Sequence, residues 1–217
     1  MTICVITCVP DGIVMGIDSR LTENITYPDG RLSQKILSDT HQKIWMINKN
    51  VGLTAHNTFD YMGKDLNVII DEFIESNVKE DDQVYLVAYR FYGFLRKYYP
   101  TLETQFWLAG YEEDEPYVIY IHKDENCRRN IENGKISYET HFGGNTKIAF
   151  GLWEKIRPKF NKMSLARAIE YVEFSIEATI KSLSFSNSYS NCGGQVNILV
   201  ITKESVRFYE EIQDVTQ

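Results

Sequence analysis

The sequence lacks any apolar run that approaches the ~20 residues needed to span a bilayer. Its first residues also lack the positively charged stretch and the long apolar core that a secretory signal peptide carries. These two absences argue against a membrane-spanning or exported protein. We therefore expect no membrane partner and a cytoplasmic location.

Cysteine and basic residues are also scarce. The four cysteines contain no C-x-x-C pair, so we expect no zinc site, no other metal site and no disulfide framework, which indicates a reducing compartment. Lysine and arginine number 23 against 30 acidic residues, giving a net charge of -7. A nucleic-acid binder needs a clustered positive surface, so a nucleic-acid partner is not expected. Nothing in the composition calls for a cofactor.

The remaining composition is that of a globular protein. The chain has 217 residues, of which 43% are hydrophobic and 13% aromatic. This is enough for one sizeable core, and no repeat, linker or low-complexity segment divides the chain. We therefore predict a single domain over residues 1–217.

The N-terminal stretch predicts a β-hairpin that starts at the second residue. Two apolar runs, Ile3–Val9 and Ile13–Ile17, flank the turn signal at residues 10–12. A hairpin brings its own ends together, so Thr2 is expected near Asp18 and Arg20. If Met1 is removed, Thr2 carries a hydroxyl and an α-amine on one residue. An α-amine has a pKa of roughly 8 and can act as the base toward that hydroxyl.

The later segments continue in blocks of hairpins and pairs of helices. Residues 21–42 are polar and turn-rich and are expected to form either a functional loop or an insertion over the sheet. The pattern then predicts strands at 43–47 and 51–55, followed by two helices, one from about 57 to 74 capped by Asn57 or Thr58 and one from about 82 to 98 capped by Asp81-Asp82. Strands follow at 104–110 and 116–122, with a short hairpin at 127–138 around Asn133-Gly134. The chain ends with helices near 145–153 and over 164–183, the second capped by Ser164, and a closing hairpin at 195–209. No βαβ alternation is sustained. The order favours two antiparallel sheets stacked between two helical layers.

This order, with several short motifs, resembles the proteasome β-subunit family of N-terminal nucleophile hydrolases over nearly the whole chain. The motifs that carry the resemblance are Thr2 after the initiator methionine, Asp18-Ser19-Arg20, Gln42-Lys43-Ile44, Phe106-Trp107-Leu108-Ala109-Gly110-Tyr111, Phe150-Gly151-Leu152, Ser164-Leu165, and Cys192-Gly193-Gly194-Gln195 with the strand that follows. The fold that the resemblance implies is α+β, a four-layer αββα sandwich of the N-terminal nucleophile (Ntn) hydrolase type.

The resemblance also implies a mechanism. Thr2 would attack a peptide carbonyl, Lys43 would keep the local potential positive, and Asp18 would orient and neutralise Lys43. Ala55 is expected to supply the oxyanion-hole N–H. Arg20, Gly144, Cys192 and Gly193 are expected to support the site.

Some positions depart from the family pattern or compete for a role in it. Lys35 stands in a second Gln-Lys-Ile motif and is the rival of Lys43, which we prefer because a strand and a hairpin follow it directly. The family usually has serine where Gly144 and Cys192 stand, and aspartate where Tyr189 stands. A Cys192 nucleophile paired with His41, His56 or His141 is an alternative that no spacing supports.

We therefore expect a threonine peptidase that acts on peptides or unfolded proteins. It would assemble as a homo-oligomeric ring or stack and could work with an unfoldase partner. One alternative is a catalytically weak or inactive subunit with a structural or binding role. Another is an amidase of the same type that acts on a small amide.

Overall fold

Two five-stranded antiparallel sheets form the centre of the computed structural model, which describes residues 2–185 and 191–209. The first sheet has the order β14-β1-β2-β15-β16, with β1 Ile3–Val9, β2 Gly12–Asp18, β14 Thr140–Gly144, β15 Val196–Ile201 and β16 Val206–Phe208. The second has the order β11-β10-β9-β6-β5, with β5 Ile44–Asn48, β6 Val51–His56, β9 Gln105–Glu112, β10 Glu115–His122 and β11 Glu125–Arg128.

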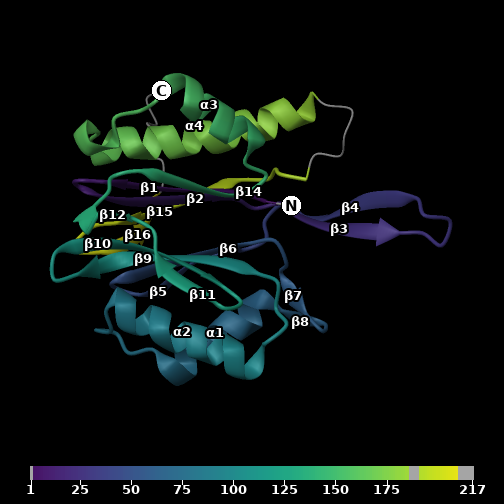
Figure 1. The fold of residues 1–217 in the computed structure, drawn as a ribbon. Helices are drawn as coiled ribbons and strands as arrows, with labels where there is room; N and C mark the ends of the chain where they lie inside the picture. Colours follow the sequence, from purple (N-terminus) through teal and green to yellow (C-terminus); the bar gives the residue numbers. More distant parts are fainter. Residues whose placement is uncertain (1, 186–190, 210–217) are drawn as a thin grey trace, which may run out of the picture.

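Helices cover the outer face of each sheet (Figure 1). The helices α1 (Leu66–Asn77) and α2 (Val84–Tyr98) pack on the second sheet. The helices α3 (Lys147–Ile156) and α4 (Leu165–Ser184) pack on the first, with a short 3-10 turn at Phe160–Lys162 between them. No helix within the described ranges combines the length and apolar character that crossing a bilayer requires.

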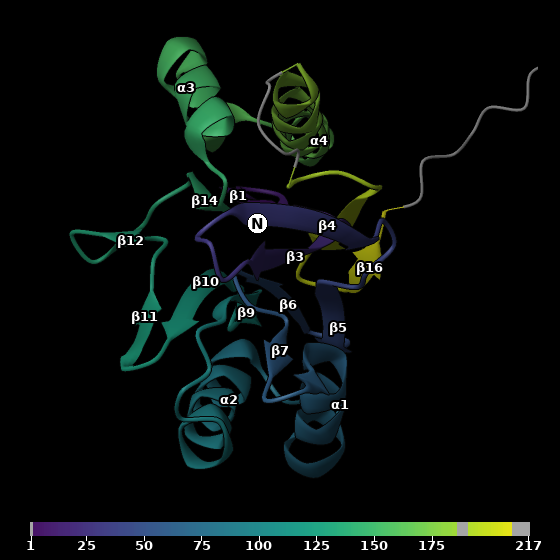
Figure 2. The same cartoon turned by 90° about the vertical axis from the view of Figure 1, so that its right-hand side faces the viewer.

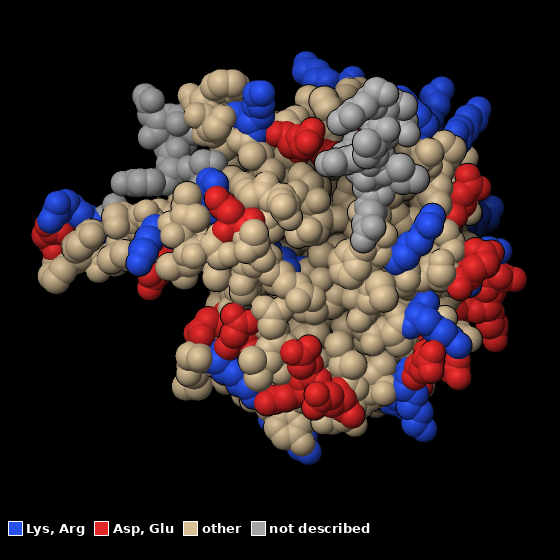
Figure 3. Space-filling model, turned by 180° about the vertical axis from the view of Figure 1, so that it is seen from behind, with Lys and Arg blue, Asp and Glu red and all other residues tan. Residues whose placement is uncertain are grey.

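Three two-stranded sheets lie outside these layers. They are β3 (Leu21–Thr26) with β4 (Leu32–Ser38), β7 (Asp60–Tyr61) with β8 (Lys64–Asp65), and β12 (Ile131–Glu132) with β13 (Lys135–Ile136). The β3–β4 hairpin projects from the body of the molecule beside the N-terminus (Figures 1 and 2). Seen from behind, the same hairpin carries both acidic and basic side chains (Figure 3).

The strand β1 is buried on both of its faces, which explains its continuous apolar run. Cys4, Ile6 and Cys8 point between the two sheets. Ile3 and Val5 point the other way, toward α3 and α4. Because successive side chains of a strand point to opposite faces, this one apolar run contributes to two separate cores.

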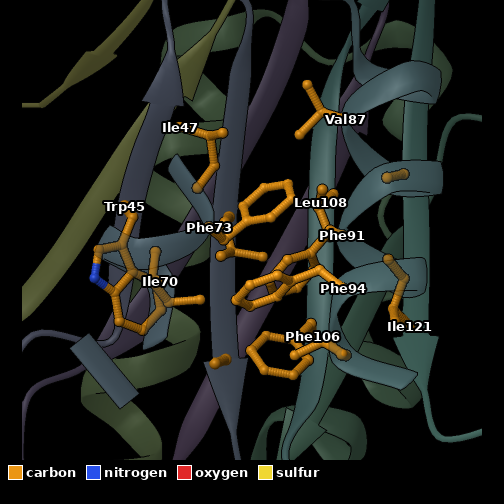
Figure 4. Packing of buried hydrophobic residues seen from close by; sticks show 14 of the residues in the cluster. Trp45, Ile47, Ile70, Phe73, Val87, Phe91, Phe94, Phe106, Leu108 and Ile121 are labelled. Atoms are coloured by element: carbon orange, nitrogen blue, oxygen red, sulfur yellow. The ribbon is translucent and has the colours of Figure 1, made fainter. Parts of the chain in front are cut away.

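A separate core lies between the second sheet and the helices α1 and α2 (Figure 4). Phe73 of α1 and Phe91 of α2 contact each other with ring centroids 4.8 Å apart, and Phe91 meets Phe106 of β9 edge-on at 4.9 Å. Aromatic pairs in these geometries add stabilisation beyond the area they bury. The two helices are held to the sheet by these rings.

The expected fold class, a four-layer αββα sandwich built on two sheets, is wrong. The described residues form five sheets of mostly antiparallel strands with four α-helices, and strand and helix account for 39% and 30% of these residues. Residues 21–42, expected to be a functional loop or an insertion over the sheet, contain the β3–β4 hairpin, and residues 60–65, expected to belong to a helix, form the β7–β8 hairpin. Both hairpins are largely exposed, so neither has the alternation of buried and exposed residues that identifies a strand.

Helix starts were also placed too early. The helix expected from residue 57 begins at Leu66, where the carboxylate of Asp65 accepts from the N–H of Asn67 at 2.7 Å. Asp82 does not cap α2, because its carboxylate accepts from the N–H of Lys79 and from Arg90. A polar residue near a helix start predicts the region of the cap and not its position.

Other predictions are confirmed. Ser164 caps α4 through its hydroxyl, which accepts from the N–H of Arg167. Asn133 and Gly134 both have positive φ, as a tight hairpin turn requires. The strands expected at 43–47 and 51–55 are β5 and β6, each within one residue.

Candidate functional site

Thr2, Asp18 and Lys43 meet where the start of β1, the end of β2 and the start of β5 come together. Thr2 directly precedes β1, Asp18 ends β2 and Lys43 directly precedes β5. The ammonium Nζ of Lys43 donates to Thr2 Oγ1 at 2.9 Å and lies 3.4 Å from Asp18 Oδ1. It also donates to the carbonyl oxygen of Arg20 at 2.6 Å. The three residues predicted from the sequence are therefore in direct contact, and Lys43 uses three donors on three different acceptors.

Asp18 and Lys43 are both completely buried. Asp18 accepts from the backbone N–H of Ile3 at 3.0 Å, of Gly193 at 2.9 Å and of Arg20 at 3.3 Å. These bonds fix the carboxylate and offset part of the cost of burying it. The first hairpin and the loop before β15 are thus joined at this one side chain.

Burial shifts the pKa values of both Asp18 and Lys43. It raises the pKa of the Asp18 carboxyl, although Lys43 and the backbone donors oppose the change. It also lowers the pKa of the Lys43 ammonium, which Asp18 partly counteracts. Both directions bring the two groups closer to exchanging a proton. An ammonium with a lowered pKa, bonded to a hydroxyl, makes that hydroxyl easier to deprotonate.

Arg20 supports the site from outside. Its guanidinium donates to both carboxylate oxygens of Asp39, at 2.6 and 3.1 Å, and its N–H donates to the carbonyl of Gly193 at 2.9 Å. A side chain at Gly193 would place Cβ 2.5 Å from the guanidinium carbon of Arg20. A larger residue there would displace the Arg20 guanidinium from its place between Gly193 and Asp39. Asp39 was missed by the sequence analysis because a single acid in a polar stretch has no distinguishing pattern.

Gly144 closes the other side of Thr2. Its φ is +79°, and a Cβ there would lie 1.7 Å from the carbonyl oxygen of Thr2. The serine that the family has at this aligned position therefore has no space. The next residue, Asn145, donates its N–H to the same carbonyl at 2.6 Å and its side chain to Asn191 at 3.3 Å. Asn145 and Asn191 are further members of the site that carried no signal in the sequence.

Ala55 is not placed to supply an oxyanion donor. Its N–H donates to the carbonyl of Lys43 at 3.1 Å within the β5–β6 pairing. Asn57 follows β6 with φ at +86° and lines the cleft beside Thr2. No hydrogen bond from the Asn57 N–H is found among the described residues, so this backbone donor replaces Ala55 as the candidate.

A cleft of about 490 Å³ opens beside Thr2. It lies between the base of the β3–β4 hairpin and the segment that follows β6; the lining residues are Thr2, Arg20, Leu21, Thr22, Glu23, Leu37, Asn57, Thr58, Phe59, Asp60 and Asp65. Its volume is within the range of small-molecule and peptide side-chain pockets. The hydroxyl of Thr2 therefore has space next to it for a reacting group.

The competing residues lie elsewhere or are unsuited to catalysis. Lys35 is exposed on β4, opposite Glu23. Cys192 is fully buried, and burial raises the pKa of its thiol to about 12, so it is not a ready thiolate. His56 and His141 line a different cavity, and His41 packs edge-on against Phe59. Met1 and Tyr189 lie outside the described residues.

The described residues contain no group of three or more histidine, cysteine or acidic side chains that could hold a metal ion. Comparison with known proteins found no matching family model and no matching curated protein.

Proposed function

We propose that the chain is an N-terminal threonine hydrolase that cleaves peptide bonds, as the resemblance to proteasome β subunits suggests. The observation that carries the proposal is the 2.9 Å bond from Lys43 to Thr2 Oγ1, made by a fully buried lysine beside an open cleft. Burying an ammonium and a carboxylate is costly, and a purely structural role would be served as well by apolar side chains.

The reaction requires cleavage of the Met1–Thr2 bond, which frees the α-amine of Thr2. The amine takes the proton of the Thr2 hydroxyl as Oγ1 attacks the substrate carbonyl carbon. The oxyanion that forms accepts a hydrogen bond from the N–H of Asn57. The tetrahedral intermediate collapses, the substrate C–N bond breaks, and the α-ammonium returns the proton to the leaving amine. Water then hydrolyses the ester on Thr2 by the same steps.

The cleft favours substrates with a basic side chain. Glu23, Asp60 and Asp65 line it and are exposed, whereas Arg20, the cation in its lining, is paired with Asp39. Three carboxylates therefore face one cation in the lining of the cleft. A lysine or arginine residue in the substrate is attracted there, and an acidic residue is repelled.

Covalent trapping tests the proposal. A peptide epoxyketone with a basic residue next to the reactive group is expected to add one inhibitor mass to the chain after Met1 has been removed. Thr2→Ala is expected to abolish the adduct and Cys192→Ala, the control, to keep it. Intact mass shows whether Met1 is present. An adduct that persists in Thr2→Ala would overturn the mechanism.

The burial of Thr2, with 1% of its surface exposed, favours the alternative of a non-catalytic subunit. The same trapping experiment tests this alternative, because a processed chain with no adduct is not a threonine peptidase and leaves a structural or binding role or an amidase. A small-amide substrate panel separates an amidase from a peptidase. Assembly into a ring or stack in the cytoplasm, with or without an unfoldase, is part of the proposal. Analytical ultracentrifugation of the processed chain tests the assembly.

A further inference from the structure

A second cavity of about 490 Å³ lies next to the first. Its lining includes His56 and Gly144, each beside a residue of the proposed active site: Asn57 follows His56 in the chain, and Gly144 packs against the carbonyl of Thr2. The remaining wall comes from β9, β10, β11 and β14. The reaction proposed at Thr2 does not use this cavity.

Three buried polar atoms around this cavity have no hydrogen-bond partner among the described residues. They are Nε2 of His56, Nε1 of Trp107 and Nε2 of His141. Only 4% of His56 and 6% of Trp107 is exposed. Buried polar groups in folded proteins are almost always satisfied by protein, ordered water or a ligand, so three in one cavity mark a place where a bound molecule can supply the partners. The indole N–H is a donor only, and it needs an acceptor.

The walls of this cavity are aromatic. The His141 ring stacks on Trp107 with centroids 5.1 Å apart and planes 23° from parallel. Tyr120 contacts Trp107 at 4.9 Å, and its hydroxyl donates to Gln105 at 2.8 Å, so its orientation is fixed. Flat rings held in this way favour a flat aromatic ligand.

Among the described residues, the lining of this cavity has no unpaired charge; Glu139, outside the lining, has its Oε1 3.8 Å from Nε2 of His141. Arg129 and Glu125, the two ionic residues in its lining, form an ion pair with each other. Burial lowers the pKa of both His56 and His141 to about 4, so the two imidazoles are neutral at pH 7. A charged ligand would lose its hydration there without gaining an opposite charge.

We propose that this cavity binds an uncharged, planar aromatic carboxamide. Its carbonyl oxygen accepts from the indole N–H of Trp107, and its amide N–H donates to a histidine Nε2. A carboxamide has a donor and an acceptor side by side, which is the set that a neutral imidazole and an indole leave unsatisfied.

Benzamide tests the proposal in the full-length chain with 15N-labelled tryptophan. The indole resonance of Trp107 is expected to shift with saturation in the millimolar range, while those of Trp45 and Trp153 stay in place. Benzoate is charged, and N,N-dimethylbenzamide has no N–H donor. Both are therefore expected to bind at least tenfold more weakly than benzamide. These comparisons need no variant. No shift with benzamide, or an equal shift with benzoate, overturns the proposal.

A matched pair of variants sharpens the result. Trp107→Phe removes the donor at the cavity and is expected to weaken benzamide binding at least tenfold, followed by the histidine ring resonances. Trp45→Phe is the control, because the Trp45 indole already donates to Asn67 at 3.0 Å and lies outside this cavity. Unchanged binding by Trp107→Phe contradicts the assignment of the donor.

Discussion

The two neighbouring cavities differ in how their buried polar groups are satisfied. Beside the first, Lys43 and Asp18 are fully buried, and every partner they need comes from the protein itself. Beside the second, His56 and Trp107 have buried nitrogen atoms for which residues 2–185 and 191–209 supply no hydrogen-bond partner. A polar network closed by its own residues holds its geometry in the absence of any ligand. Buried nitrogen atoms that lack a hydrogen-bond partner, in contrast, can be satisfied by a bound molecule.

The cavities also differ in charge. The cleft beside Thr2 is lined by exposed carboxylates and opens at the base of the projecting β3–β4 hairpin. Acidic side chains also gather over the lower part of the face shown in Figure 3, on the side of α1 and α2. The second cavity is lined by neutral imidazoles and by Arg129 and Glu125, which form an ion pair with each other. We therefore propose that the first cavity selects its substrate by charge, and the second its ligand by hydrogen bonds and shape.

The largest effect is expected from breaking the closed network. Lys43→Ala leaves the Asp18 carboxylate buried without its partner, which we expect to cost about 3–5 kcal/mol of unfolding free energy. The rate of epoxyketone trapping should fall on the order of 10³-fold. Urea unfolding and trapping kinetics measure the two effects.

Lys35→Ala is the matched control, since Lys35 is exposed on β4. It should change the unfolding free energy by less than about 0.5 kcal/mol and leave trapping unchanged. Loss of trapping in Lys35→Ala with normal trapping in Lys43→Ala would reverse the assignment of the active lysine.

The next effect concerns the wall between the cavities. Gly144→Ala places Cβ against the Thr2 carbonyl and adds a side chain at positive φ, so we expect a loss on the order of 3 kcal/mol or more. Gly134→Ala is the control. Gly134 also has positive φ, but its Cβ would meet open space, so only the backbone cost of about 1–2 kcal/mol applies. Equal losses in the two variants would mean that the contact with Thr2 contributes nothing.

The third prediction uses the neutral imidazoles of the second cavity. The pKa of His56 is about 4 in the folded chain against 6.5 when unfolded, so between these values the unfolded state binds the extra proton. The free energy of unfolding therefore decreases as the pH is lowered, by about 2 kcal/mol for each such histidine between pH 7 and pH 5. Urea unfolding of His56→Gln at both pH values should show a smaller fall than the parent chain. An identical pH dependence would mean that His56 is not buried as a neutral ring.

The sequence predicted the closed network well and the open one not at all. Thr2 and Asp18 stand at the two ends of the first hairpin, so hairpin geometry brings them together. Lys43 precedes β5 of the second sheet, and its place beside them was expected only from the family resemblance. Ala55 was wrong because its N–H is used in the β5–β6 pairing, a register detail that a pattern of apolar residues does not contain. Asn57 could have been found only from its positive φ.

Contacts between distant segments were not predictable. His141 stacks on Trp107 across the two sheets, and neither residue has a signal that names the other. The strand β14 was missed because it ends in two glycines, which have low strand propensity. The β3–β4 hairpin was not predicted because its side chains are largely exposed. Packing of remote segments decided each of these cases.

The smallest effect is expected at the acidic rim of the first cleft. Glu23 is exposed on β3, so its attraction for a basic substrate side chain is screened by water and should be worth under about 1 kcal/mol. Glu23→Gln should lower the trapping rate of a basic peptide epoxyketone by about two- to fivefold and leave that of a neutral one unchanged. The difference should shrink as salt is raised, because the Debye length falls to about 3 Å at 1 M. Glu204→Gln, an exposed acid outside the cleft lining, is the control. An equal loss for the neutral peptide would assign Glu23 a positioning role in place of charge selection.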